Sequence, residues 1–171
     1  MKYEYLAIKT IYQNTVYRSK IEAVFSAFMD LCPQVFVLPK SKLYECIRYG
    51  DYLPDFEIPI KLPQPNGTEL DFLCIIEVKP DFAFSNIDRY LNCLRKSEFT
   101  KGFYFLLLEI KNDKLKCLVF SIHDDTLFKN EKGDIETGAM ILQNCLNDWF
   151  KCSKFVKNKW AQAKMIIEHQ C

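Results

Sequence analysis

The chain of 171 residues has few glycines, few histidines and almost no net charge: 5 Gly, 2 His and a formal net charge of +1. Near-neutral charge gives no overall field to attract nucleic acid, so such binding must come from local basic patches. No apolar run approaches the roughly 20 residues that a membrane span needs, and the first part of the chain lacks a signal-peptide core. The sequence therefore predicts a soluble, cytoplasmic or otherwise intracellular protein with no membrane partner.

The chain also lacks clustered metal ligands of the soft type. Its 8 cysteines are spread along the whole sequence without a Cys-x-x-Cys pair, and His123 and His169 supply no helical pair. Structural zinc and iron–sulfur clusters need closely spaced ligands, so both are excluded. The pattern predicts free thiols in a reducing compartment.

What is abundant is apolar: 49% of the residues are hydrophobic and 15% aromatic. A chain of this length suits one domain that buries roughly 70% of its unfolded surface. The expected order is a helix over 19–31, three strands within 35–79 (short pieces over 35–49, then 52–60 and 70–79), a helix over 85–98, two strands over 102–110 and 115–123, a polar loop over 124–138, and C-terminal helices that meet near Ser153.

Alternating helices and strands of this kind predict an α/β fold with a mixed central sheet flanked by helices. We expect one domain over 1–171, with a core at about 16–123 and a helical C-terminal part at about 138–171.

Charged residues stand at the ends of two predicted strands. Asp55 follows Pro54, and Glu77 and Lys79 end an apolar run. Because side chains alternate along a strand, Glu77 and Lys79 project to the same face. Two acids that hold a divalent cation beside an ammonium group have the chemistry that phosphodiester hydrolysis requires.

Three pieces of sequence in this order resemble the PD-(D/E)xK nuclease superfamily, and within it the small phage- and bacterium-encoded endonuclease-like proteins. The pieces are Tyr17-Arg18-Ser19-Lys20-Ile21-Glu22-Ala23, Tyr52-Leu53-Pro54-Asp55-Phe56 and Glu77-Val78-Lys79, and the resemblance covers roughly residues 16–110. It implies a restriction-endonuclease-like αβββαβ core, here with an added strand and C-terminal helices. It also implies an Mg²⁺- or Mn²⁺-dependent endonuclease, a hydrolase that binds DNA and cleaves its phosphodiester bonds.

The resemblance assigns a role to each residue. Asp55, Glu77 and the carbonyl of Val78 would bind the metal, Glu22 would support a second metal or its water, and Lys79 would be the catalytic lysine. Arg18 is the basic residue that we assign to the scissile phosphate. Asn86 and Tyr90 have the four-residue spacing of a Gln–Tyr pair that contacts the site in some branches, although asparagine departs from the pattern.

Each residue also has a structural explanation. Ser19 and Glu22 have capping-box spacing, in which Glu22 would bond back to the Ser19 amide. Asp55 could be a turn residue, and Glu77 and Lys79 could form a solvated pair on a strand edge. A tight turn at Asn66-Gly67 would set Asp55 opposite Val78, on the wrong face, so the motif requires a register shifted by one residue.

Other functions stay open. Lysines accompany aromatic residues near the C-terminus, which suits contact with a nucleic-acid backbone, although the pattern favours an ordinary amphipathic helix with its aromatics in the core. The chain could be a nucleic-acid-binding or assembly factor that has the nuclease fold but does not cleave, or a purely structural αβ domain. Partners could include a second copy or another protein.

Overall fold

The computed structural model describes residues 8–38, 46–64 and 67–170. Its centre is a four-stranded mixed sheet in the order β3-β4-β5-β6. The strands are β3 (Phe56–Pro63), β4 (Glu69–Lys79), β5 (Phe103–Lys111) and β6 (Lys114–Ser121). The β4 and β5 strands run parallel, and the other two pairs are antiparallel. The mixed sheet that the sequence predicts is therefore confirmed.

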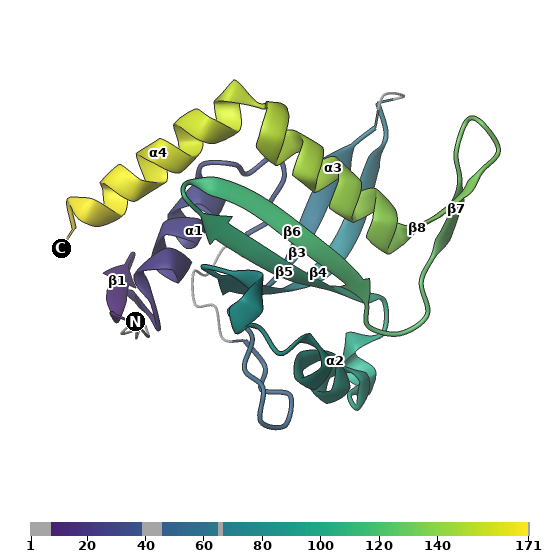
Figure 1. Cartoon of the computed structure of the whole chain (residues 1–171), viewed down its shortest axis with the longest axis horizontal. Coiled ribbons are helices and arrows are strands. Elements are labelled where there is room, and N and C mark those ends of the chain that lie inside the picture. Colours follow the sequence, from purple (N-terminus) through teal and green to yellow (C-terminus); the bar gives the residue numbers. More distant parts are fainter. Residues whose placement is uncertain (1–7, 39–45, 65–66, 171) are drawn as a thin grey trace.

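Helices cover both faces of this sheet (Figure 1). On one face lie α1 (Lys20–Asp30), α3 (Gly138–Cys152) and α4 (Lys154–Glu168), and on the other lies α2 (Ile87–Arg95), which connects the parallel strands. Ser153 separates α3 from α4, as the sequence predicts, and its hydroxyl also caps α4. Among the described residues, none of the helices is long and apolar enough to cross a membrane.

Alternation along the strands gives each face its own core. Phe56, Ile58 and Ile60 of β3 pack with α1, α3 and α4, whereas Ile75 of β4 and Phe105 of β5 pack with α2. Where both faces are covered, Cys74–Ile76 of β4 and Tyr104–Leu108 of β5 form continuous buried apolar runs, as parallel strands usually do. A charged side chain near the end of β4 therefore enters a dry environment.

The first helix is tied to the last part of the chain. Ser19 caps α1 by accepting a hydrogen bond from the Glu22 amide (3.3 Å). The ring of Phe28 on this helix lies 6.0 Å from Trp149 and 5.6 Å from Trp160, measured between ring centroids. The α1 helix thus holds the start of the described chain against α4.

Several predicted elements differ from those observed. The predicted strand at 35–38 is reduced to one bridge, Phe36 to Ile60, at the free edge of β3, and the piece at 43–49 lies partly outside the described residues. The predicted strand at 52–60 begins later, because Tyr49 and Tyr52 bridge in a turn and Pro54 has no amide hydrogen to donate. The 3₁₀ turns are η1 (Phe82–Phe84) and η2 (Glu98–Thr100).

Two hairpins occupy segments for which no strand was predicted. They are β1 (Thr10–Tyr12) with β2 (Thr15–Tyr17), and β7 (Leu127–Lys129) with β8 (Ile135–Thr137). Each strand has only three residues, which is too short to show a period of two. The seven cysteines of the described ranges are free thiols.

Candidate active site

The register of β3 and β4 decides where the two strand acids lie. Phe56 is opposite Ile76, so the preceding residue, Asp55, lies opposite Glu77. This is the register that the motif requires, shifted by one residue from that of a tight Asn-Gly turn. The Asp55 amide donates to the Ile76 carbonyl (3.2 Å), which extends the pairing beyond the end of β3.

The carboxylate of Asp55 is buried, with 2% of its side chain exposed, and both of its oxygens have partners. Oδ2 accepts a hydrogen bond from the Val78 amide (2.7 Å), so this side chain takes the place of a backbone carbonyl as the partner of that amide. Oδ1 forms an ion pair with the guanidinium of Arg18, whose side chain is half exposed. Asp55 therefore joins the end of β4 to the start of α1.

Glu77 is held in a second, adjacent pair. Its side chain is 5% exposed, and Oε1 lies 2.5 Å from Nζ of Lys79 on the same strand face. Oε2 accepts a hydrogen bond from the hydroxyl of Tyr52 (2.9 Å). Burial and the Glu77 charge raise the pKa of Tyr52 far above its usual value, so the phenol keeps its proton and acts as a donor. The pair is thus buried, in contrast to the solvated edge pair considered from the sequence.

The charges of the two pairs act on each other. Burial, together with repulsion from Glu77 and Glu22, raises the pKa of Asp55 to about 8, although Arg18 and the Val78 amide act in the opposite direction. Burial disfavours the Lys79 ammonium, but Glu77 and Asp55 outweigh that penalty and raise the pKa of Lys79. Lys79 is therefore charged at neutral pH, whereas the charged form of Asp55 is disfavoured there.

The start of α1 brings Glu22 toward Asp55 while also using it as a cap. Oε1 of Glu22 accepts from the Ser19 hydroxyl (2.8 Å), and Oε2 accepts from the Arg18 amide (3.1 Å). The predicted bond to the Ser19 amide is thus replaced by one to the preceding amide. Oε2 also lies 3.8 Å from Nε of Arg18, which links Glu22 to the ion pair with Asp55.

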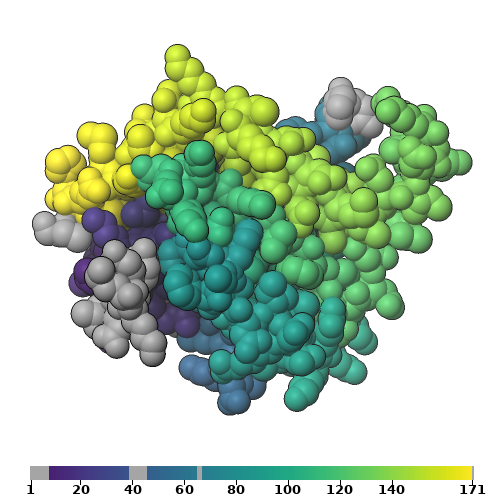
Figure 2. Space-filling view, viewed as in Figure 1, coloured from purple at the N-terminus to yellow at the C-terminus, as the bar shows by residue number. Residues whose placement is uncertain are grey.

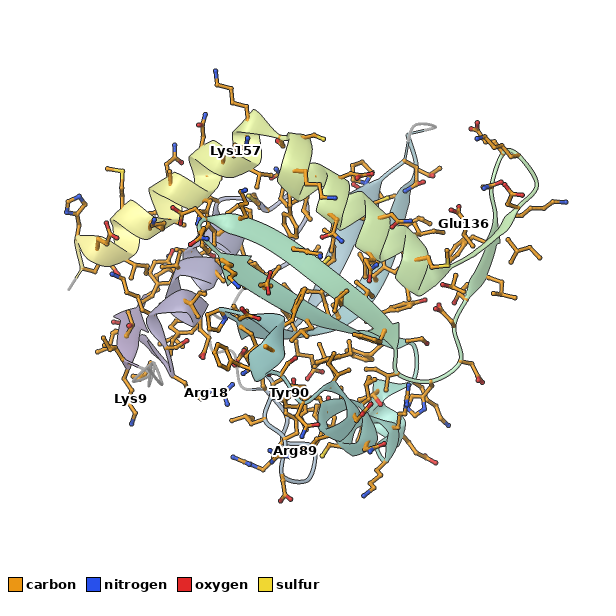
Figure 3. All side chains as sticks on the ribbon, viewed as in Figure 1. Lys9, Arg18, Arg89, Tyr90, Glu136 and Lys157 are labelled. Atoms are coloured by element: carbon orange, nitrogen blue, oxygen red, sulfur yellow. The ribbon has the colours of Figure 1, made fainter. Side chains whose placement is uncertain are left out.

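A cleft of about 300 Å³ opens in front of these residues, between the β2 hairpin, the start of α1 and the segment that precedes β3. Its lining residues are Thr15, Val16, Tyr17, Arg18, Glu22, Cys46, Leu53, Pro54 and Asp55. Glu77 and Lys79 do not line it, although their charges reach Asp55. We call this cleft the α1 cleft. Figure 3 shows Arg18, one of its lining residues, on the same side of the molecule as Tyr90.

Tyr52 is the site residue that the sequence did not reveal. Its ring stacks on Tyr90 of α2 with a centroid separation of 4.7 Å, which fixes the direction of the hydroxyl toward Glu77. No spacing rule links Tyr52 to Glu77, because the contact depends on the turn before β3. Of the weak Asn86–Tyr90 pair, Asn86 only caps α2 by accepting from the Arg89 amide (3.1 Å).

The oxygen atoms at the end of β4 form the candidate metal-binding set. Ile76 and Val78 both direct backbone groups toward β3, and the N–H and C=O of one strand residue point to the same side. The Val78 carbonyl therefore faces the edge where Asp55 lies. Within the part of the chain that the structure describes, no three His, Cys, Asp or Glu side chains are grouped as metal ligands. The candidate set is thus two acids and one carbonyl.

Comparison with protein-family models, with curated proteins and with solved structures finds no match to this chain. The interpretation of the site depends on its own geometry and on the resemblance of its three sequence pieces.

Replacing Glu22 with glutamine separates its two roles. The amide oxygen can still accept hydrogen bonds at the helix start, but the charge beside Arg18 is lost. If Glu22 serves the reaction, we expect cleavage of DNA with Mn²⁺ to slow while the melting temperature changes little. Glu168→Gln is the control, since that exposed acid forms a long 3.9 Å pair with Lys20. Cleavage at the wild-type rate would leave Glu22 as a cap only.

Proposed function

We propose that this protein is an Mg²⁺- or Mn²⁺-dependent nuclease that hydrolyses phosphodiester bonds, with DNA as its substrate. The observation that carries the proposal is the register that sets Asp55 opposite Glu77 at the end of a buried strand. Lys79 lies on the same strand face, 2.5 Å from Glu77. Burying two neighbouring carboxylates costs free energy unless bound cations compensate their charges. The pair therefore indicates a functional site.

The donor atoms fit a hard divalent cation. Asp55, Glu77 and the Val78 carbonyl would hold it, and an all-oxygen set of this kind suits Mg²⁺ or Mn²⁺. Burial, and then repulsion from Glu77 and Glu22, raises the pKa of Asp55, and a bound dication would favour its charged form. A bound cation of this kind supplies Lewis-acid polarisation of the phosphate and a more acidic water.

The other groups have roles that follow from their contacts. Lys79 keeps its proton beside two acids, so it is suited to stabilise negative charge and poorly suited to act as a base. Arg18 is half exposed at the α1 cleft and can turn from Asp55 to a phosphate group. Tyr52 holds Glu77 in one orientation through its hydroxyl.

The order of elements gives further support. The α1 helix, the bridge at Phe36, β3, β4, α2 and β5 follow one another in the sequence αβββαβ of the restriction-endonuclease-like core, with the first strand reduced to a bridge. The β6 strand and the two C-terminal helices are additions to that core.

One observation favours a second candidate, a nucleic-acid-binding or assembly factor that does not cleave. Each carboxylate of the site already has a cation, Arg18 on Asp55 and Lys79 on Glu77. A metal would have to displace Arg18 from Oδ1 of Asp55. If it cannot, the four residues form a structural ion-pair network.

Purified protein incubated with Mn²⁺ and linear, circular, branched and single-stranded DNA and RNA tests the proposal. We expect cleavage of DNA that EDTA abolishes. A parallel thermal titration should raise the melting temperature with Mn²⁺, because an ion that binds only the folded state stabilises it by mass action. The second candidate would be favoured if the protein binds nucleic acid but neither cleaves it nor melts at a higher temperature with Mn²⁺.

A further inference from the structure

A second cleft, of about 520 Å³, lies where the β5–β6 turn meets the bend between α3 and α4. Five lysines and two acids are among its lining residues, which are Glu109, Lys111, Asn112, Asp113, Lys114, Leu115, Lys116, Phe150, Lys151, Val156, Lys157 and Trp160. We call it the lysine cleft. Figure 2 shows the α3–α4 segment in yellow-green, lying against the green β5–β6 hairpin. In a chain with a net charge of +1, this is a strong local concentration of positive charge.

Four of the five lysines form no ion pair with a described residue, and the ammonium of one of them, Lys116, lies over the ring of Phe82 (5.9 Å to the centroid). Lys114, Lys151 and Lys157 are exposed, and none of them forms an ion pair with another described residue. They come from three elements: the start of β6, the end of α3 and the first turn of α4. Folding therefore brings together like charges that repel one another, an arrangement that a bound polyanion would stabilise.

The two acids of the cleft have other partners. Both oxygens of Asp113 lie 2.9 Å from Nζ of Lys164, and one accepts a hydrogen bond from the indole of Trp160 (3.2 Å). Glu109 accepts from the Phe82 amide (2.9 Å). Asp113 also occupies the left-handed region in the tight turn of the hairpin (φ 59°). Its contacts with α4 fix the two walls of the cleft relative to each other.

The floor of the cleft determines which part of a polyanion it can contact. Phe150 and Trp160 are buried, with 6% and 4% of their surfaces exposed. Neither offers an open ring on which a base could stack, so the cleft lacks the stacking platform of single-strand readers. Its exposed groups are ammonium groups, which contact phosphates without reading sequence.

The lysine cleft lies at the same end of the sheet as the candidate active site. Glu109, which lines the cleft, is the direct neighbour of Lys79 in the parallel pairing of β4 and β5. Lys111, two residues further along β5, forms a 2.5 Å pair with Asp81, just beyond the end of β4. A chain of phosphates that reaches Lys79 can therefore continue past this strand end into the cleft.

We propose that the lysine cleft binds the sugar–phosphate backbone of nucleic acid outside the bond that is cut. The choice of nucleic acid among polyanions rests on the proposed nuclease function. The cleft contributes affinity that is independent of base sequence and is weakened by salt.

Binding of a fluorescent DNA duplex in EDTA, where no cleavage occurs, tests this inference. The variant Lys114→Gln/Lys151→Gln/Lys157→Gln removes three of the four lysine charges of the cleft that have no ion-pair partner, and leaves Lys116 over the Phe82 ring. Each lost phosphate contact lowers the slope of log K against log salt by roughly 0.9, so we expect a slope reduced by roughly 2 to 3 and weaker binding. The control is Lys101→Gln/Lys129→Gln/Lys132→Gln, which removes three exposed lysines away from the cleft.

Equal loss of affinity in both triple variants would overturn the inference, because any three charges would then have the same effect. Wild-type protein that fails to bind the duplex would overturn it too, as would an acidic peptide of equal charge that competes as well as DNA. Equal melting temperatures show that both variants fold. The cleft variant could lose binding although the wild-type protein cuts no substrate with Mn²⁺. That result would support backbone binding by the lysine cleft and reject the proposed nuclease function.

Discussion

Asparagine at position 55 is expected to abolish both metal-dependent stabilisation and cleavage, while making the metal-free protein more resistant to heat above neutral pH. The pKa of the Asp55 carboxyl rises from 3.8 to about 8 on folding, mainly through burial and then through the charge of Glu77. Between these pH values the folded state holds a proton that the unfolded chain releases. The contribution of Asp55 to stability therefore falls as the pH rises from about 4 to about 8.

Asp55→Asn removes this titration but keeps an oxygen that can accept from the Val78 amide. In EDTA from pH 5 to pH 9, the melting temperature of the variant should thus increase relative to that of the wild type as the pH rises. Asp71→Asn, an exposed acid on the same β4 strand, is the control and should show no such trend. A variant that is equally destabilised at every pH would show that the pair with Arg18 stabilises the fold more than burial of the charge opposes it.

Removal of Lys79 should separate binding of the metal from the reaction itself. In Lys79→Ala we expect Mn²⁺ still to raise the melting temperature, while cleavage slows by roughly 10²–10³-fold, as when one preorganised transition-state donor is lost. The lysine is a cation among acids, so it does not compete for the donor oxygens of Asp55. In the proposed reaction it would provide positive charge where negative charge develops in the transition state.

Lys61→Ala is the matched control for this experiment. Nζ of Lys61 on β3 lies 3.1 Å from Oε2 of Glu69 on β4, so this lysine also pairs with an acid. The pair stands at the opposite end of β4 from Lys79. Its loss should leave cleavage unchanged. If Lys79→Ala cuts at the wild-type rate, or loses the metal as completely as Asp55→Asn, the roles assigned within the site are wrong.

Local signals predicted much of the fold. Ser19 was recognisable as a helix cap because a hydroxyl serves the amides of its own next turn, and the C-terminal helices were predicted to meet near Ser153, where α3 ends and α4 begins. The long apolar run before Glu77 predicted β4 closely, since a strand covered on both faces leaves little room for polar residues. The polar turn between two apolar runs predicted the end of β5 at Ile110 and the start of β6 at Leu115, and each strand extends one residue further into the turn, to Lys111 and Lys114.

Contacts between distant segments were beyond the sequence. Nothing near Arg18 indicates that its guanidinium binds Asp55, and nothing near Tyr52 indicates that its hydroxyl binds Glu77. Both depend on how the turn before β3 places its side chains. The resemblance predicted the two acids and the lysine of the site. The side chains that contact those acids in the absence of metal are known only from the three-dimensional arrangement.

The packing of α1 against the last helices also has a consequence during synthesis. Phe28 is made long before its partners Trp149 and Trp160, so the part of α1 that packs on them stays uncovered on the nascent protein until α3 and α4 have been synthesised. Contacts between segments so far apart in the chain slow folding and leave intermediates prone to aggregation. Arg18 and Glu22 stand at the start of this helix, so the cation and the cap of the acidic site are carried by an element whose packing is completed only after α3 and α4 have been synthesised.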